Sequence, residues 1–109
     1  MATTEETIKQ QLSDNPIILY MKGTPDAPQC GFSARAVSAL KNTQLKLASV
    51  DILSNPFIRE MLPQVSGWPT FPQLFVAGEL VGGSDIVAEM AQKGELLPLL
   101  SAALSGASA

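Results

Sequence analysis

The sequence contains no histidine and a single cysteine, Cys30. Without histidine there can be no His-ligated zinc, no Cys–His nucleophilic pair and no Rieske-type ligation. One cysteine cannot close an internal disulfide, which excludes a small secreted scaffold held together by disulfides. We therefore expect this thiol to stay free, in a reducing cytoplasm.

Basic residues and long apolar runs are also scarce. Lys and Arg number 7 against 10 Asp and Glu, and the resulting net charge of -3 argues against a nucleic-acid surface. No apolar run approaches the roughly 20 residues that span a membrane, and the N-terminus lacks the pattern of a signal peptide. The composition, 46% hydrophobic and 16% charged, predicts one small globular domain over residues 1–109, with a loose tail from about residue 105.

Hydrophobic spacing, caps and turn residues predict the order of the elements. Thr3 and Glu6 have the spacing of a capping box, and Asn15-Pro16 ends the short helix that follows. Asn55-Pro56 starts a later helix, and either Ser84 or Asp85 caps the next one, in which Ile86 and Met90 are expected to be buried. The expected strands are 17–21, 45–51, 73–76 and 79–81, and the expected helices include 30–42 and 96–104.

This order places a β-α-β unit first and a β-hairpin later. Right-handed crossover makes the first two strands parallel, and a hairpin turn at Ala77-Gly78 adds antiparallel partners. The prediction is an α/β fold of thioredoxin-like type, a four-stranded mixed sheet flanked by helices on both faces. Pro72 enters the third strand and marks either an edge strand or a special turn.

Cys30 follows an apolar strand and a proline-containing loop at 22–29, and it starts a helix. At that position the sulfur lies among unpaired backbone N–H groups at the positive end of the helix dipole, which favours thiolate over thiol. The alternative is a buried structural cysteine, but burial is disfavoured after such a loop. A thiolate serves either as a nucleophile or as a soft metal ligand.

Four motifs in this order resemble the monothiol (CGFS-type) glutaredoxins, in particular their single-domain bacterial members. They are Lys22, CGFS at 30–33, WPTFP at 68–72 and GGSD at 82–85. The resemblance covers nearly the whole chain. It implies a thioredoxin fold, glutathione binding, a [2Fe–2S] cluster shared between two copies of the chain, and partnership with BolA-like proteins and iron–sulfur recipient proteins.

Glutathione carries two carboxylates and one ammonium, so its groove needs two positive features and one negative. The resemblance favours glutathione-binding roles for Lys22, Arg59, Phe71, Ser84 and Asp85. Lys22 would face the glycine carboxylate, and Arg59, near the same edge, would form a bidentate grip. The helix N-terminus at 84–85 would attract the other carboxylate, and Asp85 would pair with the ammonium. The alternatives are a solvated lysine, an exposed helix arginine and ordinary helix capping.

The aromatic residues near these motifs allow several interpretations. The sequence 70–72 resembles the cis-proline loop of the family; if Pro72 is cis, the backbone of Phe71 faces an extended tripeptide. Trp68 is expected to pack under the loop rather than to contact a ligand. Phe32 either shields the sulfur or caps the core, and Gly31 leaves room for a partner chain or a cluster.

A [2Fe–2S] cluster usually takes four cysteine thiolates. One cysteine per chain supplies two in a dimer, so two glutathione sulfurs must complete the set. In this interpretation Cys30 is the metal ligand, the homodimer is bridged by the cluster, and the apo protein need not dimerise.

Three differences from relatives affect the mechanism. Dithiol relatives have a second cysteine where this chain has Ser33, and a hydroxyl cannot resolve a mixed disulfide. Some monothiol members carry a further cysteine at the position of Ser84. The segment 22–30 is longer than in dithiol relatives, and we hypothesise that it tilts bound glutathione towards iron.

The sequence thus predicts an iron–sulfur carrier acting in cluster assembly, storage or transfer. The alternative is a glutathione-dependent monothiol oxidoreductase that removes glutathione from proteins, with Cys30 as the catalytic nucleophile. A third possibility is an adaptor whose main task is complex formation with a BolA-like protein. These alternatives share one groove, and the sequence separates them poorly.

Overall fold

The computed structural model describes residues 2–106. Over that range the helices are α1 (Thr4–Asp14), α2 (Gly31–Lys41), α3 (Pro56–Ser66), α4 (Ser84–Gln92) and α5 (Leu96–Gly106). The strands are β1 (Ile17–Met21), β2 (Gly23–Thr24), β3 (Ala27–Pro28), β4 (Ala48–Asp51), β5 (Gln73–Val76) and β6 (Glu79–Gly82).

The main sheet has the strand order β4-β1-β5-β6. β1 pairs parallel with β4, with Ile18 opposite Ala48, and antiparallel with β5, with Ile18 opposite Phe75. All five residues of β1 are buried, because side chains alternate between two covered faces. The predicted four-stranded mixed sheet with helices on both faces is confirmed.

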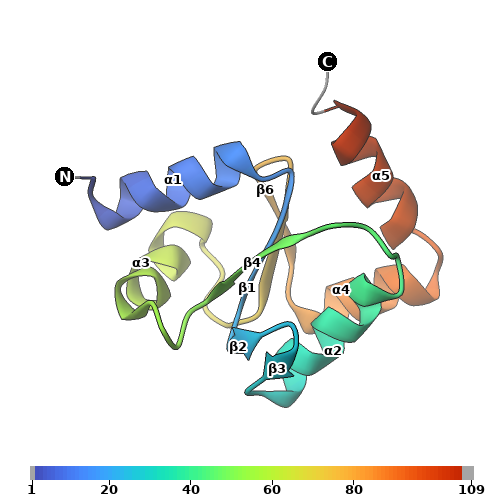
Figure 1. Cartoon of the computed structure of the whole chain (residues 1–109), viewed down its shortest axis with the longest axis horizontal. Coiled ribbons are helices and arrows are strands. Elements are labelled where there is room, and N and C mark those ends of the chain that lie inside the picture. Colours follow the sequence, from blue (N-terminus) through green and yellow to red (C-terminus); the bar gives the residue numbers. More distant parts are fainter. Residues whose placement is uncertain (1, 107–109) are drawn as a thin grey trace.

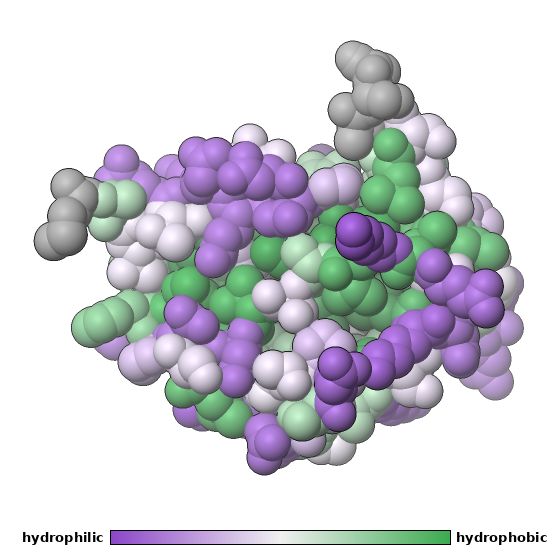
Figure 2. All heavy atoms as spheres, viewed as in Figure 1, coloured by the Kyte–Doolittle hydropathy of each residue, from purple (hydrophilic) through white to green (hydrophobic). Residues whose placement is uncertain are grey.

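The side chains on the two faces of β1 belong to two separate hydrophobic core clusters. Ile17, Leu19 and Met21 pack with residues of α2, α4 and α5, whereas Ile18 and Tyr20 pack with residues of α1 and α3. Figure 1 shows α1 and α3 together on one side of the sheet and α2 and α4 on the other. In Figure 2 hydrophilic side chains cover the outer side of α1, and hydrophobic ones gather between the sheet and α5.

None of the helices within residues 2–106 is long and apolar enough to cross a membrane.

The predicted capping box and the predicted hairpin turn are both present in the structure. The capping box forms in full, since the backbone N–H of Glu6 donates to Thr3 Oγ1 at 3.1 Å and that of Thr3 donates to Glu6 Oε1 at 3.0 Å. The β5–β6 turn has positive φ at both Ala77 (53°) and Gly78 (79°), the geometry that matches strand twist in a two-residue hairpin.

Other predictions about the strands were wrong. The second strand of the main sheet begins at Ala48, not at residue 45, because pairing with β1 starts there. The segment 22–29 is not plain loop: it folds into the β2–β3 ribbon. The edge-strand explanation of Pro72 fails, because β5 lies between β1 and β6; the Phe71–Pro72 bond is cis.

The start of α4 also differs from the prediction. Gly83, not Ser84 or Asp85, is the N-cap, because the chain turns at Gly82 (φ 148°) and Ser84 is already helical. Val87 is the fully buried residue of this helix, whereas Ile86 is only partly buried, as is Met90.

The last helix, α5, continues to Gly106, two residues beyond its predicted end at residue 104. The rest of the predicted loose tail, residues 107–109, lies outside the described residues.

Candidate functional site

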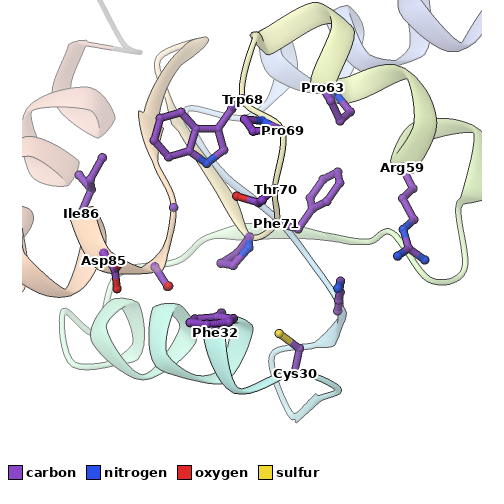
Figure 3. A pocket seen from close by; sticks show the side chains of 14 residues that line it. Cys30, Phe32, Arg59, Pro63, Trp68, Pro69, Thr70, Phe71, Asp85 and Ile86 are labelled. Atoms are coloured by element: carbon purple, nitrogen blue, oxygen red, sulfur yellow. The ribbon is translucent and has the colours of Figure 1, made fainter.

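A cavity of about 750 Å³ opens between the start of α2, α3, the loop 68–72 and the start of α4 (Figure 3). Its lining includes all six residues singled out in the sequence: Lys22, Cys30, Arg59, Phe71, Ser84 and Asp85. These residues come from five separate parts of the chain, and the fold brings them together around one space.

Cys30 is the N-cap of α2, in extended backbone conformation (φ -157°, ψ 140°), and its side chain is partly exposed. The backbone N–H of Ser33 does most to lower the pKa of this thiol; the N–H of Phe32, the Ser33 hydroxyl and the charge of Lys22 add to it, while burial opposes them. The N–H groups of Phe32 and Ser33 belong to the first helical turn, where backbone donors have no partner within the helix. The sulfur is therefore prepared to react or to ligate as a thiolate.

The backbone beside Lys22 is held on three sides. Its N–H donates to the Ser33 hydroxyl at 3.1 Å, and its carbonyl accepts from the N–H of Gln29 at 2.9 Å. The next N–H, of Gly23, donates to Asp51 Oδ1 at 2.9 Å. Ser33 is fully buried, and the hydrogen bond to its hydroxyl links the end of β1 to the helix that carries Cys30. The backbone at Lys22 is thus tied to the start of the helix that carries Cys30.

The loop 68–72 forms the opposite wall and rests on a buried amide. Gln73 is fully buried, and its Nε2 donates to the carbonyls of Trp68 at 2.8 Å and Thr70 at 3.1 Å. The indole N–H of Trp68 is buried, and a Cβ added to Gly83 would lie 3.4 Å from it. Trp68 is partly buried and also lines the cavity, so its packing under the loop without ligand contact stays a prediction.

Opposite charges stand at opposite sides of the cavity. Figure 3 shows Arg59 reaching in from α3 on one side and Asp85 lying at the start of α4 on the other, with Cys30 and Phe32 between them on α2. Ser84 is buried, whereas the Asp85 side chain is 84% exposed and pairs with Arg35 Nη1 at 2.6 Å. The lining suits a zwitterion with separated charges.

The structure decides between the two alternatives for Phe32. It is 62% exposed and lines the cavity, so it does not cap the core. Phe32 points from the first turn of α2 towards the cavity, whereas Ser33, Ala36 and Val37 of the same helix are buried. A Cβ added to Gly31 would meet nothing within 4 Å, which leaves the approach to the sulfur open.

Sequence reasoning missed three polar residues that hold this site: the Ser33 hydroxyl, Asp51 and Gln73. Each acts through hydrogen bonds to backbone atoms of other segments. Such contacts leave no spacing pattern in the sequence. A polar residue within an apolar run, such as Gln73 before Leu74 and Phe75, was the one available signal.

The donor chemistry of one chain limits what the site can hold. No group of three or more His, Cys, Asp or Glu that could bind a metal ion occurs among residues 2–106. Cys30 is then the one strong soft donor that the cavity offers, and any soft metal centre needs thiolates from outside the chain.

The sequence over residues 17–81 matches the glutaredoxin family. The chain belongs to that family. It is 61% identical over 97 residues to glutaredoxin 4 of Haemophilus ducreyi, an overlap of 89% of this chain and 91% of the relative. It is 64% identical over 88 residues to the probable monothiol glutaredoxin GrlA of Legionella pneumophila, an overlap of 81% of this chain and 99% of the relative.

The fold comparison agrees. The solution structure of reduced apo GrxS14 from poplar matches with a TM-score of 0.79 at 42% identity, and covers 93% of both chains. Together with the single cysteine of its CGFS motif, these likenesses make the protein a monothiol glutaredoxin, and the resemblance seen in the sequence is confirmed.

Proposed function

We propose that this monothiol glutaredoxin binds glutathione in its cavity and carries a [2Fe–2S] cluster between two copies of the chain, in cluster assembly, storage or transfer. The observation that carries the proposal is the combination of one activated thiol with a cavity of separated charges. The thiol can ligate iron, and the cavity can hold the second thiol that iron requires.

The residues present fit glutathione. Lys22 and Arg59 offer two cations for a carboxylate, and Arg59 can grip it with two parallel hydrogen bonds. At the other side the N-terminus of α4, at Ser84, attracts the second carboxylate, and Asp85 accepts from the ammonium. Phe71 lies along the loop between these ends and supplies backbone pairing to an extended tripeptide.

The cluster fits only in a shared arrangement. Two Cys30 thiolates and two glutathione thiolates make the usual four ligands, and the bound cluster supplies iron and sulfide for transfer. The partly exposed sulfur and the open space beside Gly31 favour the approach of a second chain. A BolA-like protein and iron–sulfur recipient proteins are the proposed partners at this mouth, in a reducing cytoplasm.

A second candidate is removal of glutathione from proteins, and the lowered pKa of Cys30 favours it. The Cys30 thiolate attacks the glutathione sulfur of a mixed disulfide, and the protein thiolate leaves. A second glutathione thiolate then attacks that sulfur, which yields glutathione disulfide and restores the Cys30 thiolate. Ser33 offers no competing thiol, so each cycle consumes an external glutathione.

Anaerobic reconstitution with iron and sulfide, with and without glutathione, separates the two. The carrier function requires visible absorbance that appears only with glutathione and is lost in Cys30→Ser. A colourless protein with fast turnover of a glutathione mixed disulfide would support the oxidoreductase function and overturn the cluster-carrier function.

The glutathione site has its own matched controls. Lys22→Ala should weaken glutathione binding about tenfold by calorimetry, whereas the exposed Lys46→Ala, outside the cavity, should not. Equal affinity in both variants would contradict the placement of glutathione.

A further inference from the structure

We infer that Asp51 is a positioning residue for the cationic end of the cavity: its carboxylate sets the spacing of Lys22 and Arg59 for a carboxylate of the bound tripeptide. The inference rests on the proposed glutathione site. Asp51 does not itself line the cavity, and no sequence motif singles it out.

Asp51 stands where two strands separate. It is the last residue of β4 and lies opposite Met21, the last residue of β1, in the parallel ladder. After this pair the two chains lead to different parts of the site. β1 continues directly into Lys22, and β4 continues through the turn 52–55 into α3, which carries Arg59. A residue at this point of separation can therefore affect the position of both cations.

The Asp51 carboxylate joins the two branches. Oδ1 accepts from the N–H of Gly23 at 2.9 Å on one branch and from the N–H of Leu53 at 2.9 Å on the other. Oδ2 accepts from the hydroxyl of Ser54 at 3.0 Å. These donors hold the pKa of the Asp51 carboxyl below its ordinary value, the Gly23 N–H most of all, so the group is ionised at neutral pH.

The backbone of Asp51 extends the same control to the start of α3. Its carbonyl accepts from Asn55 Nδ2 at 2.8 Å, and the Asn55 carbonyl accepts from the N–H of Arg59 at 3.0 Å. Arg59 is thus two hydrogen bonds away from Asp51. On the other branch, the Gly23 amide is covalently next to Lys22, so both cations depend on one residue.

Three variants separate a positioning role from general stability. Asp51→Ala removes all the side-chain bonds. Asp51→Asn keeps an acceptor for the Gly23 and Leu53 amides and turns a donor towards the Ser54 hydroxyl, which can accept. Ser54→Ala removes one bond within the α3 branch and leaves the link to Gly23 intact.

The probe is a pair of ligands measured by calorimetry: glutathione, and glutathione esterified at its glycine carboxylate. Asp51→Ala should weaken binding of glutathione about tenfold but change binding of the ester less than about twofold, because the ester lacks the carboxylate that the cations grip. Asp51→Asn and Ser54→Ala should each stay within about twofold of the parent chain for both ligands. Asp51→Glu, which keeps the charge but displaces it, gives the same selective loss if Asp51→Ala does not fold.

Equal weakening of the two ligands, or no weakening, overturns the positioning role while the proposed function stands. Failure of the parent chain to bind glutathione at all overturns the proposed function itself. Preference of the parent chain for the acid over the ester, lost selectively in Asp51→Ala, supports both.

Discussion

The sulfur of Cys30 lies at the N-cap of α2, and the backbone N–H groups of Ser33 and Phe32 lower the pKa of its thiol, Ser33 most of all. Lys22 adds a smaller electrostatic contribution. Backbone donors are fixed by the helix, so the thiolate does not depend on the position of one flexible cation. At the scale of single residues, reactivity therefore follows from where the helix begins.

The pH dependence of alkylation tests this origin. The rate of Cys30 modification by iodoacetamide should rise with pH to a midpoint below that of an ordinary thiol, because the thiolate is the reacting form and its pKa is lowered. Ser33→Ala should raise the midpoint but leave it below the ordinary value, since the backbone donors remain. A parent midpoint at or above that of a free thiol contradicts the assignment.

The chemistry and position of each residue explain only some of the six cavity residues that the sequence analysis singled out. Cys30 followed from its position at a helix start, whereas the binding role of Lys22 at the strand exit depended on the family resemblance. Arg59 and Phe71 depended on the family resemblance, because helix charges and loop aromatics are common on any surface. The role of Asp51 could not be predicted, because its partner Gly23 is far away in the sequence; the sequence left two alternatives for Phe32, and its exposure of 62% decides between them.

The β2–β3 ribbon is the element that borders both Lys22 and Cys30. Gly23 pairs with Pro28 and Thr24 with Ala27, and the bond between Lys22 and Gln29 closes its base. Strands of two residues have no periodic pattern, so the sequence shows only a loop here. The hairpin at Ala77-Gly78, in contrast, joins two longer strands and was predicted correctly.

Shortening this ribbon tests the hypothesis that it tilts glutathione away from disulfide exchange. Deletion of residues 24–27 joins Gly23 to Pro28, which already lie opposite each other, and spares the Lys22–Gln29 bond. Turnover of a glutathione mixed disulfide should increase on the order of tenfold, because the sulfur gains a better line of attack. Unchanged turnover in a folded variant counts against the hypothesis.

Gly23 is the residue on which the ribbon's geometry depends. Its φ is 90°, and an added Cβ would lie 2.5 Å from the carbonyl oxygen of Ala27. Gly67 also has positive φ (75°), but a Cβ there meets nothing within 4 Å. Gly23→Ala should lower the free energy of unfolding by about 3 kcal/mol and Gly67→Ala by about 1 kcal/mol. Urea denaturation measures both, and equal losses would show that crowding at Gly23 has no effect.

At the scale of the whole molecule, the pattern of strands and helices was the most predictable feature. β1 is apolar throughout, which predicts a strand covered on both faces, and the β-α-β order predicts its parallel partner. The N-cap of α4 at Gly83 and the end of α5 at Gly106 depend on local turns and packing that the sequence pattern does not specify.

The central claim is that one cysteine per chain leaves the cluster dependent on borrowed thiols. Native mass spectrometry of the chain reconstituted with iron, sulfide and glutathione tests it most directly, because the mass counts every component. We expect a species of two chains, two glutathione molecules and one [2Fe–2S] cluster, which falls apart into monomers when the cluster is removed. A cluster-bearing species without glutathione, or one that persists in Cys30→Ser, would contradict the account.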